Sequence, residues 1–299
     1  MSNPTSTSHL LPAPGVEQAY CNVSALEGGI LKLSSSQFTT SGIPGEVLIV
    51  PCLAFLLQHS TDGDKFLFDL GIRKDWHTYP PVTTRLIETY GTNVPQDVVE
   101  SLAKGGTSPS EISTICLSHV HFDHMGDCSL FPNSTFFLGE ESKQVLTPEY
   151  VEPLIVKDLP LDRTKFLSTV DWQPLGPFPH ALDFYGDGSL YIIDAAGHLP
   201  GHINILARTS ADGAWIFLGG DSAHHWDLVT GKGQIAVHEH MQGFSRCAYL
   251  DKDATERHLA RMRELLRMDR VRIVLAHDEP WYKINKGGAA FWPGKIPSL

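Results

Sequence analysis

Three histidines and two aspartates lie within the ten residues 118–127, which read SHVHFDHMGD. The preceding residues, EISTICL, have the apolar character of a buried strand. In an extended chain alternate side chains point to the same face, so His119 and His121 can aim at one point. Asp123 and His124 follow the strand, where a turn can present them to a neighbouring point. The fold must therefore gather several polar side chains at the end of a buried strand.

Imidazole and carboxylate groups are the ligands that a borderline divalent ion such as zinc prefers. Four of them this close together indicate two ions rather than one. Two ions about 3.5–4 Å apart can share one solvent oxygen, and they need roughly seven protein ligands between them. The alternative is a polar loop with chance histidines. We disfavour it because the whole chain has 15 histidines in 299 residues, so three within six positions are improbable by composition.

Further segments have the same form, a buried strand followed by polar residues. They are SLYIIDAAGHLPGHINILARTS (189–210), GAWIFLGGDSAHH (213–225) and VRIVLAHDEP (271–280). Polar groups at the ends of several strands predict a shared pocket at one edge of a sheet. Earlier in the chain, EVLIVPCLAFLLQH (46–59), broken by Pro51, and FLFDLG (66–71) predict a hairpin.

Helices are predicted at 81–91, at 94–106 and at 253–269. Pro95 suits an early position in the second of these. The third carries an apolar face made of Leu259, Met262, Leu265 and Leu266. We expect one domain over 1–299, with an N-terminal arm at 1–20 and an insertion or lid at 147–188, which is rich in proline.

Composition excludes several classes of protein. The formal charge is 23 basic minus 34 acidic residues, or −11, and a chain that grips a nucleic acid backbone needs clustered Lys and Arg. The five cysteines form no C-x-x-C pair, which favours a reducing compartment, and we predict the cytoplasm. The first residues do not look like a signal peptide. No stretch of about 18 apolar residues predicts a membrane span.

The sequence resembles the metallo-β-lactamase superfamily. HVHFDH matches the H-x-H-x-D-H signature of that family, and AGHLPGH, LGGDSAH and VLAHDEP follow in the family's order. FLFDLG resembles an early family element whose aspartate, here Asp69, orients a ligand histidine. The resemblance runs from about residue 47 to 280. One departure is Ala195-Ala196, where the family has Thr-Pro. The implied fold is an α+β protein, the αβ/βα sandwich of two mixed β-sheets flanked by helices.

The resemblance also implies a metal site and a mechanism. One ion would be held by His119, His121 and His198, and the other by Asp123, His124 and His277, with Asp221 and a hydroxide bridging the two. We expect two Zn²⁺, and ions such as Fe or Mn are the alternatives. The bridging hydroxide would be the nucleophile, and Asp123 would pass a proton to the leaving group.

His224 occupies the position, three residues after the bridging aspartate, where lactonases of this superfamily place a tyrosine that binds the substrate carbonyl. We expect His224 either to replace that donor or to line the pocket. His202 is expected to support the site or to pack, and His238 and His240 to lie in a solvated loop. Cys116 and Cys128 are expected to be buried. Four aromatic residues are candidates for a pocket wall: Trp226, Phe244, Trp281 and Trp292.

Among the branches of the superfamily, the lactonase-like group is the most similar. We therefore predict a hydrolase that opens a small, neutral lactone, lactam or cyclic carbamate. One alternative is a glyoxalase II-like thioesterase, which needs cationic residues; YKINK (282–286) is the candidate. The others are an iron-dependent persulfide dioxygenase and a metal-binding scaffold without activity. The expected partner is a small cyclic molecule, and we expect the protein to bind neither nucleic acid nor membrane. A homodimer is possible on the sequence alone.

Overall fold

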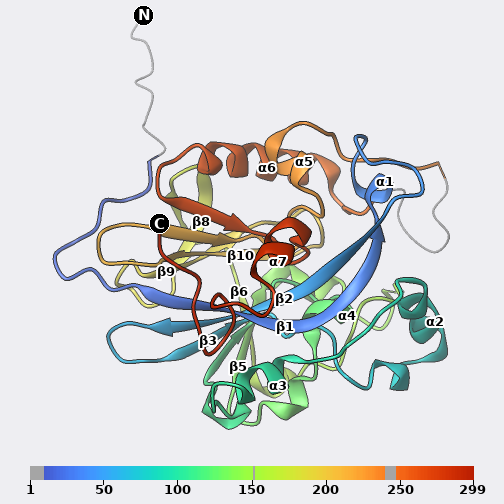
Figure 1. Ribbon diagram of the computed structural model, residues 1–299, viewed down its shortest axis with the longest axis horizontal. Helices are drawn as coiled ribbons and strands as arrows, with labels where there is room; N and C mark the ends of the chain where they lie inside the picture. The colour runs from blue at the N-terminus through green and yellow to red at the C-terminus, as the bar shows by residue number, and fades with distance from the viewer. Residues whose placement is uncertain (1–9, 151, 240–246) are drawn as a thin grey trace, which may run out of the picture.

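The computed structural model describes residues 10–150, 152–239 and 247–299, and it forms two six-stranded sheets that face each other (Figure 1). The first sheet has the order β1 (Cys21–Ser34), β2 (Val47–His59), β3 (Lys65–Phe68), β4 (Thr114–Cys116), β5 (Thr135–Gly139) and β6 (Thr164–Leu167). The second has the order β12 (Val271–Val274), β11 (Trp215–Leu218), β10 (Ile203–Arg208), β9 (Leu190–Asp194), β8 (Phe178–Asp183) and β7 (Gln173–Leu175). Each sheet combines parallel and antiparallel pairs, so the predicted two mixed sheets are confirmed.

Helices cover the outer faces of both sheets (Figure 1). The α-helices are α1 (Ser35–Phe38), α2 (Pro81–Thr89), α3 (Val98–Ala103), α4 (Phe122–Met125), α5 (Trp226–Thr230), α6 (Lys252–Leu266) and α7 (Glu279–Asn285). Short 3₁₀ helices are η1 (Trp76–Thr78), η2 (Pro109–Glu111), η3 (Cys128–Leu130), η4 (Glu140–Gln144) and η5 (Leu161–Arg163). Within the described ranges, no helix has the length and apolar character needed to cross a membrane.

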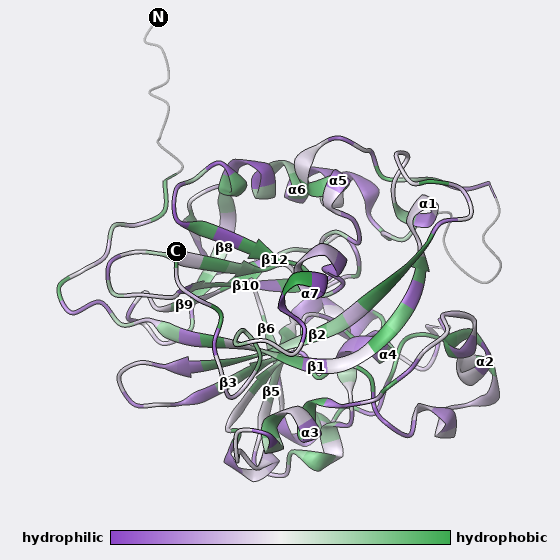
Figure 2. Ribbon diagram, viewed as in Figure 1, coloured by the Kyte–Doolittle hydropathy of each residue, from purple (hydrophilic) through white to green (hydrophobic). Residues whose placement is uncertain are grey.

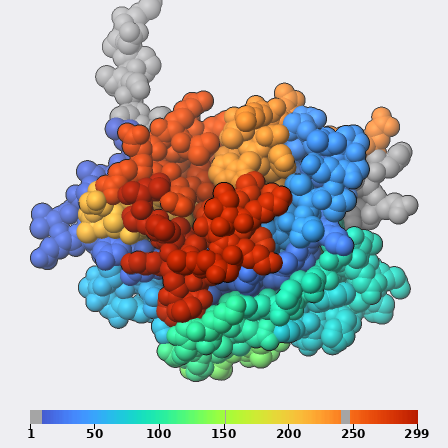
Figure 3. Space-filling model, viewed as in Figure 1, coloured from blue at the N-terminus to red at the C-terminus, as the bar shows by residue number. Residues whose placement is uncertain are grey.

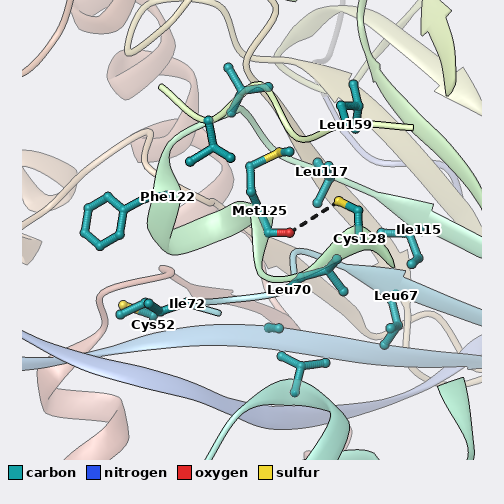
Figure 4. Close-up of a cluster of buried hydrophobic side chains, with 14 of the residues drawn as sticks. Cys52, Leu67, Leu70, Ile72, Ile115, Leu117, Phe122, Met125, Cys128 and Leu159 are labelled. Carbon is teal, nitrogen blue, oxygen red and sulfur yellow. Dashed lines mark hydrogen bonds between the residues drawn. The ribbon is translucent and has the colours of Figure 1, made fainter. Parts of the chain in front are cut away.

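The strands β10 and β11 are buried along their whole length, because the other sheet covers one face and helices cover the other. Figure 2 shows hydrophobic residues, in green, along strands of both sheets. Phe55 and Phe68 of the first sheet meet Ile205 of the second in the central cluster. The outer face of the first sheet forms another cluster, in which Met125 and Cys128 pack among aliphatic side chains (Figure 4). This packing anchors α4, so the histidine cluster rests on a rigid base.

Strand β2 continues through Pro51, although we expected that residue to break the run. Pro51 pairs with Ile30, next to a bulge in β1 between Glu27 and Ile30. A bulge interrupts the regular ladder of hydrogen bonds, which is why a residue without an N–H is tolerated there. The hairpin with β3 is confirmed.

Two helix predictions need correction at their edges. The helix expected from residue 94 begins at Val98, because Asp97 caps it and Glu100 completes a capping box. Pro95 therefore lies before the helix. On α6, Leu266 is 37% exposed and does not belong to the buried face, which instead includes His258.

The segment 147–188, expected to be an insertion or lid, contributes strands to both sheets from residue 164 onward. Its residues supply β6 at the edge of the first sheet, and β7 and β8 at the edge of the second. Short edge strands with mixed burial lack a clear alternating pattern, so their sequence resembles a loop. In the N-terminal arm, the Arg208 guanidinium donates to the carbonyls of Pro12 and Ala13.

The C-terminal segment is bound to β1 by backbone hydrogen bonds, and Figure 3 shows it, in red, on the surface of the molecule. Ala25 donates its backbone N–H to Ala290 and accepts one from Trp292, and Ile296 donates to Val23. This contact pairs backbone groups that an edge strand would otherwise expose.

Candidate metal centre

The ends of several strands meet at one edge of the sandwich. The predicted ligand residues follow β4, β11 and β12 or lie in the loop between β9 and β10. Seven side chains are brought together: His119, His121, Asp123, His124, His198, Asp221 and His277. All but His121 are at least 93% buried. Ala195-Ala196 in place of Thr-Pro does not prevent His198 from reaching the group.

The first group contains His119, His121 and His198. Nδ1 of His121 lies 3.0 Å from Nε2 of His119 and 3.0 Å from Nε2 of His198. Zinc–nitrogen bonds of about 2.0–2.1 Å in a tetrahedral arrangement put two ligand nitrogens roughly 3.3 Å apart. The three nitrogens therefore have nearly the spacing that one zinc ion requires.

The second group contains Asp123, His124 and His277. Nε2 of His277 lies 3.3 Å from Oδ2 of Asp123, and Nε2 of His124 lies 3.8 Å from the same oxygen. Asp221 stands between the groups. Its Oδ2 faces His119 at 3.7 Å and His198 at 3.5 Å, whereas its Oδ1 faces His124 at 3.3 Å and His277 at 3.4 Å. A carboxylate with one oxygen toward each group has the geometry of a bridging ligand.

Each of these histidines has its second ring nitrogen directed away from the centre. Nδ1 of His198 donates to the carbonyl of Ala248 at 2.9 Å, and Nδ1 of His277 donates to that of Pro51 at 2.8 Å. Nε2 of His121 faces Oε1 of Glu152 at 3.4 Å. Outer partners of this kind choose the tautomer and leave the inner nitrogen with a free lone pair, as metal ligation requires.

Asp69 and Ser118 orient the other two rings. The Asp69 carboxylate accepts from the Ser118 N–H at 2.7 Å, from the Ser118 hydroxyl at 2.8 Å and from Nδ1 of His124 at 2.8 Å. The Ser118 oxygen lies 3.0 Å from Nδ1 of His119 and can accept a hydrogen bond from the N–H of that ring. The backbone of Asp69 has a φ of 62°, in the left-handed region, which is uncommon for a residue with a side chain. Asp69 therefore supports the His124 ring, as the resemblance implied.

Two buried atoms of the centre test whether metal ions fit it. Nε2 of His124 and Oδ1 of Asp221 have no hydrogen-bond partner within the described part of the chain. Buried polar atoms without partners are costly, and a cation between them would satisfy both. Burial lowers the pKa of His119 and of His198 well below the usual value, so both rings are neutral, as ligands must be. Burial opposes the charged form of His124 and His277 too, but Asp221 and the other nearby carboxylates raise the pKa of both rings well above the usual value, so a metal ion would displace a proton from each. The donor set therefore fits divalent ions.

The two carboxyl groups of the centre are ionised. Burial favours their neutral form, but the positive fields of neighbouring histidines more than offset it. The pKa of Asp123 is lowered through His124 and His277, and the pKa of Asp221 is held well below its usual value chiefly through the same two rings. Asp123 must therefore accept a proton before it can give one away.

The centre forms the floor of a pocket with a volume of about 100 Å³. Most of its wall is apolar, from Leu31, Leu33, Phe38, Leu154, Leu199 and Leu250. Tyr90, Gln37 and Glu152 add polar groups. Among the described lining residues there is no Lys or Arg.

The aromatic wall predicted from the sequence is wrong for three of its members. Trp226 donates to Asp278, Trp292 donates to the carbonyl of Leu102, and Trp281 packs against Phe291, and none of the three lines the pocket. Phe244, the fourth, lies outside the described residues, as does His240. The apolar wall is mostly aliphatic, and the aromatic residues among the described lining residues are Phe38 and Tyr90.

The remaining histidines are also placed. His224 lines the pocket, with Nε2 3.1 Å from Oδ2 of Asp221. His202 is buried, and its Nε2 accepts the backbone N–H of Asp221 at 3.1 Å, so it supports the loop that carries this carboxylate. His238 is half-buried beside the carbonyl of Gln37. Cys116 and Cys128 are buried, as expected.

Several residues at the site carry no signal in the sequence. Glu152 and Phe38 come from segments far from the histidine cluster, and Tyr249 lies 3.0 Å from the His224 ring. Cys52 presents its Sγ to Asp123 and His277, with the three ligand atoms within 4.8 Å of one another. The β1–β2 ribbon and the loops around the pocket bring these residues to the site.

A family model described as "Metallo-beta-lactamase superfamily" matches residues 48–213. The chain belongs to the metallo-β-lactamase superfamily. The "Gamma-lactamase MBL2" of Gibberella moniliformis is 38% identical over 53% of this chain and 70% of its own length. "Cytochrome P450 monooxygenase mpaDE" of Penicillium roqueforti is 31% identical over 89% of this chain. The chain spans only 34% of the length of that relative.

Solved structures share this fold. An N-acyl homoserine lactone hydrolase, with the product N-hexanoyl-L-homoserine bound at its catalytic metal centre, matches with a TM-score of 0.68. The match covers 93% of this chain and 100% of the other, at 18% identity. At that identity the likeness concerns the arrangement of the two sheets and the helices, and it confirms the predicted sandwich.

Proposed function

We propose that this chain is a hydrolase that holds two divalent metal ions, zinc in the first place, and opens a small, neutral lactone, lactam or cyclic carbamate. The observation that carries the proposal is the position of Asp221. One of its oxygens faces each histidine group, on the floor of a mainly apolar pocket. Both the γ-lactamase relative and the lactone hydrolase structure have names that indicate cyclic substrates, which supports the same class.

When bound, the two ions would polarise the substrate carbonyl and lower the pKa of a water molecule toward neutrality. The residues of the chain do the rest. His119, His121 and His198 would hold one ion, Asp123, His124 and His277 the other, and Asp221 both. The aliphatic wall excludes bulk water and packs against the apolar part of the ring. The small volume of the pocket limits the size of the group that reaches the floor.

Two residues would act on protons directly. Asp123 is ionised in the resting protein, so it can accept a proton from the attacking water and then give it to the leaving group as the ring opens. His224 can donate a hydrogen bond from Nε2 to the carbonyl oxygen as negative charge develops there. Its position beside Asp221 in the pocket supports this role.

The thioesterase alternative fits the pocket less well. Glutathione thioesters carry carboxylates, and the YKINK segment (282–286) that was a candidate for binding them lies in and just after α7, away from the pocket lining. A persulfide dioxygenase would use a single iron, and the second group of ligands would then have no function. Neither reading gains support from a specific contact in the described residues.

A substrate panel tests the proposal. The purified metal-loaded protein should be assayed with neutral lactones, lactams, cyclic carbamates and glutathione thioesters at equal concentration, and its metals should be counted. Hydrolysis of a cyclic substrate with close to two ions per chain is expected. Preference for the thioester would replace ring opening by thioester hydrolysis, and oxygen consumption with one iron would support the dioxygenase.

A further inference from the structure

His224 is held by a tyrosine that is distant in sequence. The Tyr249 hydroxyl lies 3.1 Å from the backbone nitrogen of His224 and 3.0 Å from its Nδ1. Tyr249 is 1% exposed, so water does not compete for its hydroxyl. The ring of Phe38 stacks on the His224 imidazole at a centroid distance of 4.4 Å and an angle of 8°. These contacts leave the imidazole little freedom to rotate.

Counting donors and acceptors fixes the position of the proton on His224. A backbone N–H can only donate, so the Tyr249 oxygen accepts from it. Among the described residues, Nδ1 of His224 is the one other polar partner of this phenol, so the buried phenolic hydrogen is satisfied only if Nδ1 accepts it. Because Nδ1 accepts, the neutral imidazole must carry its hydrogen on Nε2. That nitrogen lies 3.1 Å from Oδ2 of Asp221, a good distance for donation to a carboxylate.

This arrangement decides between two roles for His224. With its hydrogen on Nε2, the ring has one N–H, which it can donate to Asp221 or, when a substrate is bound, to an oxygen in the pocket. With its hydrogen on Nδ1, it would present a lone pair to the same carboxylate, which is repulsive, or would become an extra ligand for a metal ion. His224 lies among ligand histidines, with ring centroids 5.1 Å from His198 and 5.7 Å from His277, so such competition is realistic.

We propose that Tyr249 is a positioning residue that keeps His224 as the Nε2–H tautomer, and so as a hydrogen-bond donor rather than a metal ligand. The tautomer follows from the contacts alone, whereas its effect on turnover rests on the proposed function. Lactonases place a phenol directly at position 224. In this chain an imidazole occupies that position, and the phenol lies behind it.

Nuclear magnetic resonance of the zinc-loaded protein tests the tautomer without any substrate. Long-range proton–nitrogen correlations of histidine side chains distinguish Nδ1–H from Nε2–H rings, and His224→Gln assigns the signal. We expect an Nε2–H pattern for His224. An Nδ1–H pattern, or nitrogen shifts typical of a zinc-bound Nε2, would overturn the proposal. The wild-type spectrum alone decides this point, even if a variant at position 249 does not fold.

Tyr249→Phe then tests the cause, because it removes only the hydroxyl. We expect the His224 signal to lose its pure Nε2–H pattern and kcat to fall about 10–100-fold, as for other groups that orient a site residue, with KM little changed. Tyr185→Phe is the matched control. It removes a hydroxyl that donates to Asp64, away from the pocket, and should change neither readout. An unchanged His224 spectrum in Tyr249→Phe would refute the role.

The spectroscopic and kinetic results separate the two proposals. If the protein opens no cyclic substrate but the tautomer depends on Tyr249, the proposed function fails and the positioning role stands. If a cyclic substrate is hydrolysed at the same rate by Tyr249→Phe, with the tautomer unchanged, the positioning role fails and the function stands.

Discussion

Replacing Asp69 by Asn should weaken one of the two metal positions. The carboxylate accepts three hydrogen bonds, two from Ser118 and one from Nδ1 of His124, and its side chain is 1% exposed. An amide keeps the size, but it has one oxygen and an NH₂ group that can only donate. If its oxygen keeps the Ser118 N–H, the NH₂ meets Nδ1 of His124. The imidazole must then accept at Nδ1 and carry its proton on Nε2, where the metal should bind.

The expected loss follows from that conflict. Groups that orient a ligand histidine typically contribute about 10–100-fold in metal affinity, or about 1.4–2.7 kcal/mol. The loss should fall on the ion held by His124, because His119 contacts Asp69 only through Ser118. Titration with a chelator while both ions are counted measures the two affinities separately. Asp127→Asn is a matched control outside the pocket lining. An equal loss of affinity for both ions, or no loss for either, would refute the reasoning.

Four further predictions concern single residues. Asp221→Ala should lower the affinity for both ions, as measured by metal analysis. Loss of one ion alone would mean that Asp221 does not bridge the two. Asp123→Asn should lower turnover by about 10²–10⁴-fold, most for substrates with poor leaving groups; equal losses across a leaving-group series would indicate a misplaced metal instead. His224→Ala should lower kcat by about 10²–10³-fold with metal content intact, whereas a rise in KM alone would reduce its role to shaping the pocket. Burial lowers the pKa of His59, but hydrogen bonds to two carboxylates more than offset it, so the pKa is raised in the folded protein. The protonated ring stabilises the folded state fully below pH 6.5, and this stabilisation is lost as pH rises through the folded pKa. The free energy of unfolding, measured with denaturant, should therefore fall over this pH range in the wild type, and His59→Gln should lack that decrease.

The candidate metal centre was largely predictable because the residues proposed to hold metal form local patterns in the sequence. His119 and His121 alternate along the chain as neighbours on one face of an extended segment must, and Asp221 and His277 follow runs of apolar residues that could only be buried strands. The same burial predicted the hairpin of β2 and β3. These features depend on side-chain type and spacing, which are properties of the sequence itself.

The orientation of the ligands was decided only by the tertiary structure. His198 and His277 donate to the backbone carbonyls of Ala248 and Pro51. Because every residue has a backbone carbonyl, the sequence does not indicate which one forms such a hydrogen bond. Tyr249 reaches His224 across a separation of 25 residues. Strands β6, β7 and β8 were missed for a related reason, since their place at the sheet edges depends on backbone pairing with partners already in position. The sequence determined which groups could bind metal, and long-range packing determined which atom of each group points at it.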